Sequence, residues 1–206
     1  MDSPPLAKSR IRAKADPANK ERSKTLIVVL ENPANHSNVG AVIRSIDAFG
    51  ARALYVVNPP DAKFKMPDWP ISRSQKGPLA CSSSSANKWT FVKVFSSTAK
   101  CYDHLESLGF ASYVTSPHRK DKPCYNLKDG KYTDKKVAVW FGNELEGITD
   151  EAVARAKACI AIPMLGMIES LNLSVSAGVV LSEVVHQRRE HCAKKRLARG
   201  VNFFIE

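Results

Sequence analysis

The chain has 206 residues, 44% of them hydrophobic and 25% charged, which suits one compact α/β domain with short tails, and we expect no second full domain. No apolar run reaches the about 18 residues that span a bilayer, and the five cysteines lack the spacing of a disulfide framework or a zinc site, so we expect a soluble, cytoplasmic protein without a bound metal. The net charge of +11 indicates a polyanionic partner or a basic tail.

Positive charge is concentrated at the two ends of the chain. Residues 1–24 hold seven Lys and Arg against three acids, and residues 186–206 hold six against two. We therefore expect a basic arm at 1–24, a folded domain at 25–190 and a basic tail at 191–206, with ends that suit phosphate groups better than a membrane surface. Basic ends that merely aid solubility are the alternative. The candidate phosphate contacts are Arg10, Arg12, Lys14, Arg188, Arg189 and Arg196.

The N-terminal residues also leave an organellar transit peptide open as an interpretation. Lys, Arg and Ser are frequent among the first 24 residues, as such peptides require. Asp2, Asp16 and Glu21, together with the prolines, argue against it.

The first elements after the arm predict a βαβ unit. Residues 25–32, TLIVVLEN, are an apolar run rich in β-branched side chains, which is typical of a strand buried on both faces. Asn35 and Asn38 are good N-caps for a helix whose apolar residues recur at helical spacing until Gly50. Residues 53–58, ALYVVN, predict the next strand.

The rest of the chain continues the alternation of strands and helices. Residues 59–88 are rich in Pro, Ser and Lys and predict no regular element beyond a short helix. Strands are expected at 91–95, 110–115, 137–142 and 159–163, helices near 97–108, near 149–157 and from about Ser174 to Arg189, and an exposed loop at 118–136. This order predicts an α/β fold with a mostly parallel sheet flanked by helices.

Three segments lie where ligands bind in such sheets, beyond the carboxyl ends of strands. They are residues 32–44, NPANHSNVGAVIR, residues 141–148, FGNELEGI, and residues 162–174, IPMLGMIESLNLS. None contains G-x-G-x-x-G or G-x-x-x-x-G-K, so the two commonest nucleotide-binding fingerprints are absent and a Rossmann-type enzyme is disfavoured.

The polar residues of the first two segments admit two interpretations. Asn38 either caps the helix or faces a ligand, and Arg44, six residues later, is either a surface residue or reaches back toward the helix start. Gly142 follows a buried strand, where the missing Cβ permits close backbone approach to a ligand. Glu144 and Glu146 either complement a helix dipole or take part in the site.

The third segment surrounds Gly166 with apolar side chains and ends on Ser170, Asn172 and Ser174. Backbone donors and acceptors in a hydrophobic surround are what an adenine ring requires. The Met, Leu and Ile side chains equally suit a loop that covers the core.

Taken in order, the three segments resemble the three motifs of the TrmH/SpoU family of the SPOUT superfamily, RNA ribose 2′-O-methyltransferases that use S-adenosylmethionine (AdoMet). The resemblance extends over roughly residues 25–190. IPMLGMIESLNLSVSAGVVLSE is its most specific part, FGNELEGI matches well, and the first segment contributes mainly Asn38, Gly40 and Arg44. The resemblance implies that the C-terminal part of the sheet forms a trefoil knot, a feature that composition cannot show.

The resemblance also implies roles for individual residues. Thr115, Gly142, Ile162 and Leu171 would hold AdoMet, largely through backbone groups. The reaction is an in-line attack of a ribose 2′-hydroxyl on the methyl group of a sulfonium, so the site must align the two and stabilise an alkoxide, without a metal. The catalytic set would be Asn38, Arg44, Glu144, Ser170 and Asn172.

Within this set, the counterpart of Arg44 in related enzymes is assigned as the base. Because a guanidinium resists deprotonation, we expect stabilisation of the alkoxide or of a phosphate as its minimum role. Ser170 and Asn172 would position Arg44 or the ribose, and Glu144 would orient Asn38 or another member of the set.

The family resemblance leaves the RNA and the assembly to be decided. A homodimer is implied, to which the helix from Ser174 to Arg189 would contribute unless its apolar residues all serve the core. We expect a D-loop guanosine of tRNA as the target, with rRNA as the alternative. A catalytically inactive RNA-binding factor and a base methyltransferase are the remaining hypotheses.

Overall fold

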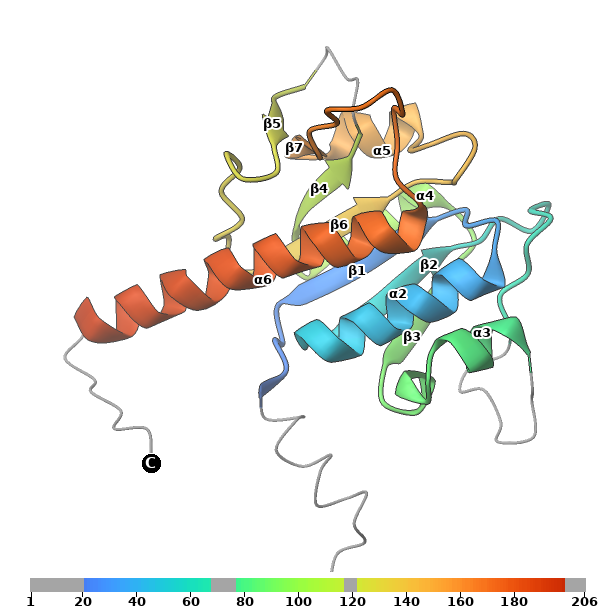
Figure 1. Cartoon of the computed structure of the whole chain (residues 1–206), viewed down its shortest axis with the longest axis horizontal. Helices are drawn as coiled ribbons and strands as arrows, with labels where there is room; N and C mark the ends of the chain where they lie inside the picture. Colours follow the sequence, from blue (N-terminus) through green and yellow to red (C-terminus); the bar gives the residue numbers. More distant parts are fainter. Residues whose placement is uncertain (1–20, 68–76, 117–121, 199–206) are drawn as a thin grey trace, which may run out of the picture.

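The computed structural model describes residues 21–67, 77–116 and 122–198, and within these ranges seven strands form one sheet (Figure 1). The strand order is β3-β2-β1-β6-β4-β7-β5, and every pairing is parallel. The strands are β1 (Leu26–Glu31), β2 (Ala53–Val57), β3 (Phe91–Phe95), β4 (Ala111–Thr115), β5 (Cys124–Asn126), β6 (Val137–Phe141) and β7 (Ala158–Ala161). The helices are α2 (His36–Phe49), α3 (Pro78–Ser82), α4 (Thr98–Ser107), α5 (Asp150–Arg155) and α6 (Leu173–Ala198), with a 3₁₀ turn at Ala86–Lys88.

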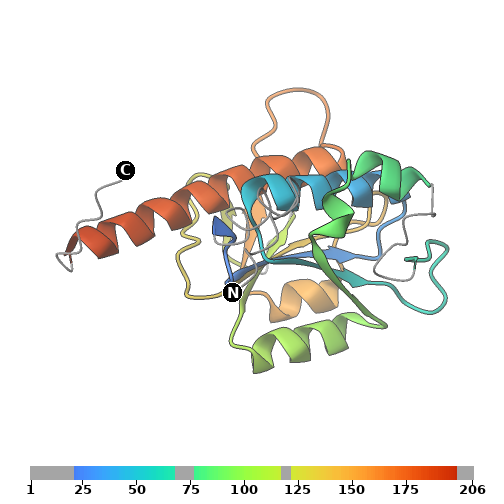
Figure 2. The same cartoon turned by 90° about the horizontal axis from the view of Figure 1, so that it is seen from below.

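Helices cover both faces of the sheet. Figure 2 shows α2, α3 and α6 on one side and α4 and α5 on the other. The central strands β1 and β6 are therefore buried along their whole length, which explains why they are continuous apolar runs rather than alternating ones. None of the helices in the described ranges is long and apolar enough to cross a membrane.

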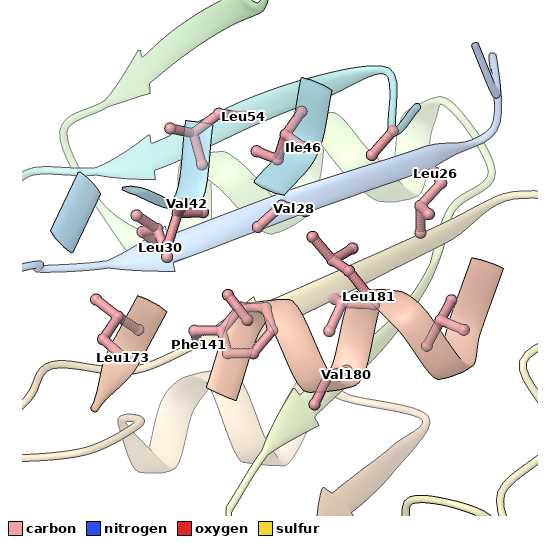
Figure 3. Packing of buried hydrophobic residues seen from close by; sticks show 14 of the residues in the cluster. Leu26, Val28, Leu30, Val42, Ile46, Leu54, Phe141, Leu173, Val180 and Leu181 are labelled. Atoms are coloured by element: carbon pink, nitrogen blue, oxygen red, sulfur yellow. The ribbon is translucent and has the colours of Figure 1, made fainter. Parts of the chain in front are cut away.

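Each face of the sheet has its own hydrophobic cluster. On the α2 and α6 side, Val28 and Phe141 pack with Leu173 and Leu181 (Figure 3). On the α4 and α5 side, Trp140 stacks on Tyr102 with ring centroids 4.2 Å apart. These buried side chains hold the carboxyl ends of the strands in a fixed relation to the starts of the helices.

The bounds of α2 follow from its caps. The Asn35 side chain accepts a hydrogen bond from the Ser37 backbone N–H at 2.7 Å, and Gly50 ends the helix in the left-handed region at φ 69°. Gly40 lets α3 pack directly against α2, because a Cβ there would lie only 2.5 Å from the Leu79 carbonyl oxygen. The helix α3 thus lies within the stretch for which the sequence predicts only a short helix.

The predicted α/β class with a mostly parallel sheet is confirmed, and the predicted strands form within a residue or two of their expected bounds. Two expectations were wrong in detail. The short strand β5 forms within residues 118–136, which were predicted to be a loop, and α6 continues to Ala198 instead of ending near Arg189. Residues 191–198, expected to belong to a tail, are therefore helical.

Candidate active site

The three segments singled out in the sequence meet at the carboxyl ends of β1, β6 and β7. A cavity of about 460 Å³ lies between the loop that follows β6 and the segment that precedes α6. A smaller cavity of about 90 Å³ adjoins it on the β7 side, where it reaches Ile162 and Met164. Both cavities are lined by Thr115, Ser170 and Leu171, and the larger one also by Gly142, Glu144 and Asn172.

A chain of hydrogen bonds joins the three segments beside the larger cavity. The Asn172 amide Nδ2 donates to Asn38 Oδ1 at 3.1 Å, and Asn38 Nδ2 donates to Glu144 Oε1 at 2.8 Å. The other carboxylate oxygen, Glu144 Oε2, accepts the Ala34 backbone N–H at 2.8 Å. Three of the five predicted catalytic residues are thereby brought into one network, although Asn38 lies more than a hundred positions before the other two.

The helix caps account for where these side chains point. Asn35 is the N-cap of α2, so Asn38 is free to face Glu144. Asn172 precedes α6, and its Oδ1 accepts from the Ser174 backbone N–H at 2.8 Å. Asn172 therefore both caps a helix and joins the network.

The β6 loop needs Gly142 for a different reason from the one expected. The sequence suggested close approach to a ligand, whereas an added Cβ would collide first with the backbone of Gly147 and Ile148. The loop folds back on itself, with the Asn143 and Gly147 backbones paired by hydrogen bonds of 2.8 and 2.9 Å. Gly142 thus makes a tight turn possible, and that turn forms one wall of the larger cavity.

Two residues of the site were missed in the sequence. Asn143 Oδ1 accepts from the Leu145 backbone N–H at 2.8 Å, and Asn143 Nδ2 donates to the Asn32 carbonyl at 2.6 Å. Glu31, at the end of β1, is buried and accepts from the backbone N–H of Thr149 at 2.9 Å. The only signals were an Asn directly after a strand, which favours an Asx turn, and a single acid at the end of an apolar run.

Arg44 and Ser170 do not join the network. Arg44 is exposed, and within the described ranges its side chain makes no hydrogen bond or ion pair. It lies six residues after Asn38, which places the two side chains about 120° apart around the helix axis. Ser170 is exposed between the two cavities, and Glu146 is exposed at the edge of the larger one.

The predicted phosphate contacts differ among themselves. Arg188 is half-buried and donates to the carbonyl oxygens of Tyr132 at 3.1 Å and Asp134 at 2.6 Å, and to Thr25 Oγ1 at 2.7 Å. Burial lowers the pKa of its guanidinium. These bonds hold α6 to the segments that precede β1 and β6. The phosphate contact expected of Arg188 stays a prediction.

The other predicted phosphate contacts are exposed or lie elsewhere. Arg189 and Arg196 are exposed on α6 and line a cavity of about 530 Å³ at the amino ends of the strands, together with Arg22 and Arg188. Arg10, Arg12 and Lys14 lie outside the described residues.

The loop between β7 and α6 exposes large apolar side chains. Leu165 and Met167 are fully exposed, and Ile168 is 64% exposed. Figure 2 shows this loop, in orange, projecting beyond the helices. On α6, Val175 and Val179 are also exposed, whereas Leu181 lies in the core. The third segment therefore leaves an apolar surface uncovered beside the cavities, and its most exposed side chains do not cover the core.

The structure shows no evident metal site in the part of the chain that it describes. Within the ranges 21–67, 77–116 and 122–198, there is no group of three or more His, Cys, Asp and Glu side chains that could hold a metal ion.

The chain is similar in sequence and in fold to known proteins. Residues 25–182 match the model of the SpoU rRNA Methylase family. The chain belongs to this family. Over 177 residues it is 33% identical to the tRNA (guanosine(18)-2′-O)-methyltransferase of Thermus thermophilus, a match that covers 86% of this chain and 82% of that relative. The family assignment made from the three motifs is thus confirmed.

Solved structures of the family share the fold. The TrmH/SpoU tRNA modifying enzyme of Aquifex aeolicus superimposes with a TM-score of 0.70 at 29% identity, covering 88% of this chain and 85% of that one. The SpoU methyltransferase AviRb of Streptomyces viridochromogenes, crystallised with AdoMet, gives a TM-score of 0.66 at 24% identity and covers 84% and 64%.

Proposed function

We propose that the chain transfers a methyl group from AdoMet to a ribose 2′-hydroxyl of tRNA, with a D-loop guanosine as the target, in the cytoplasm. The observation that carries the proposal is the network of Asn172, Asn38 and Glu144 at the rim of the larger cavity. A relative that is 33% identical over most of both chains is named for guanosine-18 of tRNA, which favours tRNA over rRNA.

Thr115, Gly142, Ile162 and Leu171 are the residues that we propose to hold AdoMet. The larger cavity, at about 460 Å³, falls in the size range of small-molecule sites, and the smaller one extends it toward Ile162. Its walls combine backbone groups of the Gly142 turn with the apolar side chain of Leu171, a combination that suits an adenine ring. AdoMet would supply an electrophilic methyl group. The trefoil knot of the family stays a prediction for this chain.

The catalytic roles follow from what each polar group can do. Asn38 donates a hydrogen bond to Glu144 and accepts one from Asn172. Both the nitrogen and the oxygen of the Asn38 amide are therefore held, and the side chain is pre-oriented. Arg44 is exposed, and we propose that its guanidinium acts through its charge, on the alkoxide or on a neighbouring phosphate. Ser170, between the two cavities, would contact the ribose.

The proposal includes a homodimer formed through the apolar surface of the third segment. Leu165, Met167 and Ile168 on the loop and Val175 and Val179 on α6 are exposed beside the cavities. An exposed apolar patch of this kind marks a contact surface. In sedimentation analysis, we expect the Val179→Asp variant to be a monomer and the Leu197→Asp variant, changed at the other end of α6, to remain a dimer. A wild-type monomer would contradict this part of the proposal.

A long substrate is favoured by the position of the basic residues. Arg196 lies 22 residues after Ser174 on the same helix, which corresponds to about 33 Å at 1.5 Å per residue. Arg189 and Arg196 are therefore far from the cavity, and we propose that they contact the phosphates of a folded RNA. The same role is proposed for Arg10, Arg12 and Lys14 in the arm at 1–24, outside the domain at 25–190.

Methyl transfer from tritiated AdoMet tests the proposed function. We expect incorporation into an unmodified tRNA transcript, little into rRNA fragments, and a loss of at least about 100-fold in rate for Arg44→Ala, as for removal of one charge-stabilising group. Preferred incorporation into rRNA would support the alternative target. AdoMet binding without transfer to any RNA would support the inactive RNA-binding factor instead.

A further inference from the structure

Glu31 is a buried carboxylate that ends the central strand β1. It is 2% exposed, and an ionised carboxylate in such a place is costly unless hydrogen bonds compensate it. Its Oε1 accepts from the hydroxyls of Thr98 at 2.5 Å and Thr149 at 2.7 Å, and its Oε2 accepts from the Thr149 backbone N–H at 2.9 Å. Thr98 begins α4 and Thr149 caps α5, so Glu31 joins two helix starts to the end of β1.

Thr149 also directly follows the β6 loop, residues 142–148. The other end of the loop is held by Asn143, whose Nδ2 donates to the carbonyl of Asn32, the residue after Glu31. Between these two points, Glu144 accepts from Ala34 and Asn38. The loop is therefore held at one end by the last residue of β1 and at the other by the residue that follows it, and Glu144 lies between these two anchors.

We propose that Glu31 and Asn143 are positioning residues that hold the β6 loop in the shape that walls the larger cavity and presents Glu144 to Asn38. The proposal rests on the proposed function, because it assigns that cavity to AdoMet. Neither residue contacts reacting atoms. A loop held in its binding shape before the cofactor arrives loses less conformational freedom on binding, which raises affinity.

A purely structural role for Glu31 predicts a different effect on cofactor affinity, and variants of Thr98 and Thr149 distinguish it from the positioning role. The hydroxyls of Thr98 and Thr149 donate to the same oxygen atom, Oε1 of Glu31. Thr98 leads only into α4, whereas Thr149 follows the β6 loop directly. If Glu31 only stabilises the fold, loss of either hydroxyl lowers the melting temperature and leaves cofactor affinity unchanged.

Calorimetric titration of AdoMet into the full chain, with the melting temperature of each variant, tests the proposal. We expect Thr98→Val to change the Kd less than about two-fold and Thr149→Val to raise it about ten-fold, the equivalent of one hydrogen bond. Thr149→Ser, which keeps the hydroxyl, should restore wild-type affinity. Asn143→Asp keeps the acceptor for Leu145 but loses the donor to Asn32, so it should also raise the Kd about ten-fold.

The outcomes separate the two levels of inference. A wild-type chain that does not bind AdoMet would refute the proposed function itself. Wild-type binding with equal effects of Thr98→Val and Thr149→Val on the Kd would overturn the positioning role. If Thr149→Val does not fold, Asn143→Asp decides, and an unchanged Kd for that variant would overturn the proposal.

Discussion

Gly142→Ala places a methyl group where the β6 loop has no space. The added Cβ would lie 2.1 Å from the Gly147 carbonyl carbon, whereas real Cβ atoms essentially never approach a heavy atom closer than 3.0 Å. The neighbouring atoms are backbone of Gly147 and Ile148, so no side chain can swing aside. The loop must open, and the paired backbone hydrogen bonds between Asn143 and Gly147 stretch or break.

The expected cost follows from these two effects. Overpacking of a tight site costs about 1–3 kcal/mol, and each weakened hydrogen bond costs about 1 kcal/mol. With two such bonds, the free energy of unfolding should fall by about 3–5 kcal/mol, which does not exceed the about 5–15 kcal/mol of a typical domain. Because the displaced backbone walls the larger cavity, AdoMet affinity should fall by at least ten-fold as well.

Urea unfolding followed by tryptophan fluorescence, with AdoMet titration of the folded protein, measures both effects. Gly166→Ala is the matched control, because a Cβ at Gly166 meets no heavy atom within 4 Å. Its stability should stay level or rise by up to about 1 kcal/mol. A Gly142→Ala variant with wild-type stability and wild-type AdoMet affinity would refute the reasoning about the turn.

Two further predictions concern residues away from the cavity. Arg188→Ala should lower the free energy of unfolding by about 2–3 kcal/mol in a urea titration, because it removes the hydrogen-bond donor to two partly buried carbonyl oxygens. Arg189→Ala should leave that free energy unchanged and weaken RNA binding in a filter assay. The reverse pattern would contradict the role assigned to Arg188. Burial acts to raise the pKa of Asp134, but hydrogen bonds from Lys157 and Tyr113 outweigh it and leave that pKa below its ordinary value. The stabilisation is present above the ordinary aspartate pKa of about 3.9 and is lost as the pH falls through the lower folded value. The melting temperature of Asp134→Asn should thus depend less on pH in that acid range, and an unchanged dependence would contradict the assignment.

Much of the fold could be predicted because its strands are buried on both faces. Residues 26–31 and 137–141 are short apolar runs, and Asn35 and Gly50 carry the capping preferences that bound α2. The strand β5 could not be predicted, since all three of its residues are exposed at the sheet edge and show no alternation. The far end of α6 was missed because beyond Arg189 it leaves the core and has no apolar face.

The site could be located from the sequence but not assembled from it. Parallel strands bring their carboxyl ends to one edge, so the meeting of the three segments was predictable. The bond between Asn172 and Asn38 joins residues 134 positions apart and has no local signal. The sequence alone predicts Arg188 to be a surface residue, because the carbonyl groups that accept its hydrogen bonds, those of Tyr132 and Asp134, belong to a loop that is distant in sequence.

The chemical identity of the methylated product tests the central claim most directly. Unmodified tRNA transcript is incubated with the full chain and methyl-labelled AdoMet, digested to nucleosides and separated, with Asn38→Ala as the inactive control. The account predicts label in 2′-O-methylguanosine with the wild-type chain and none with the variant. Label on a nucleobase, or transfer that persists in Asn38→Ala, would contradict it.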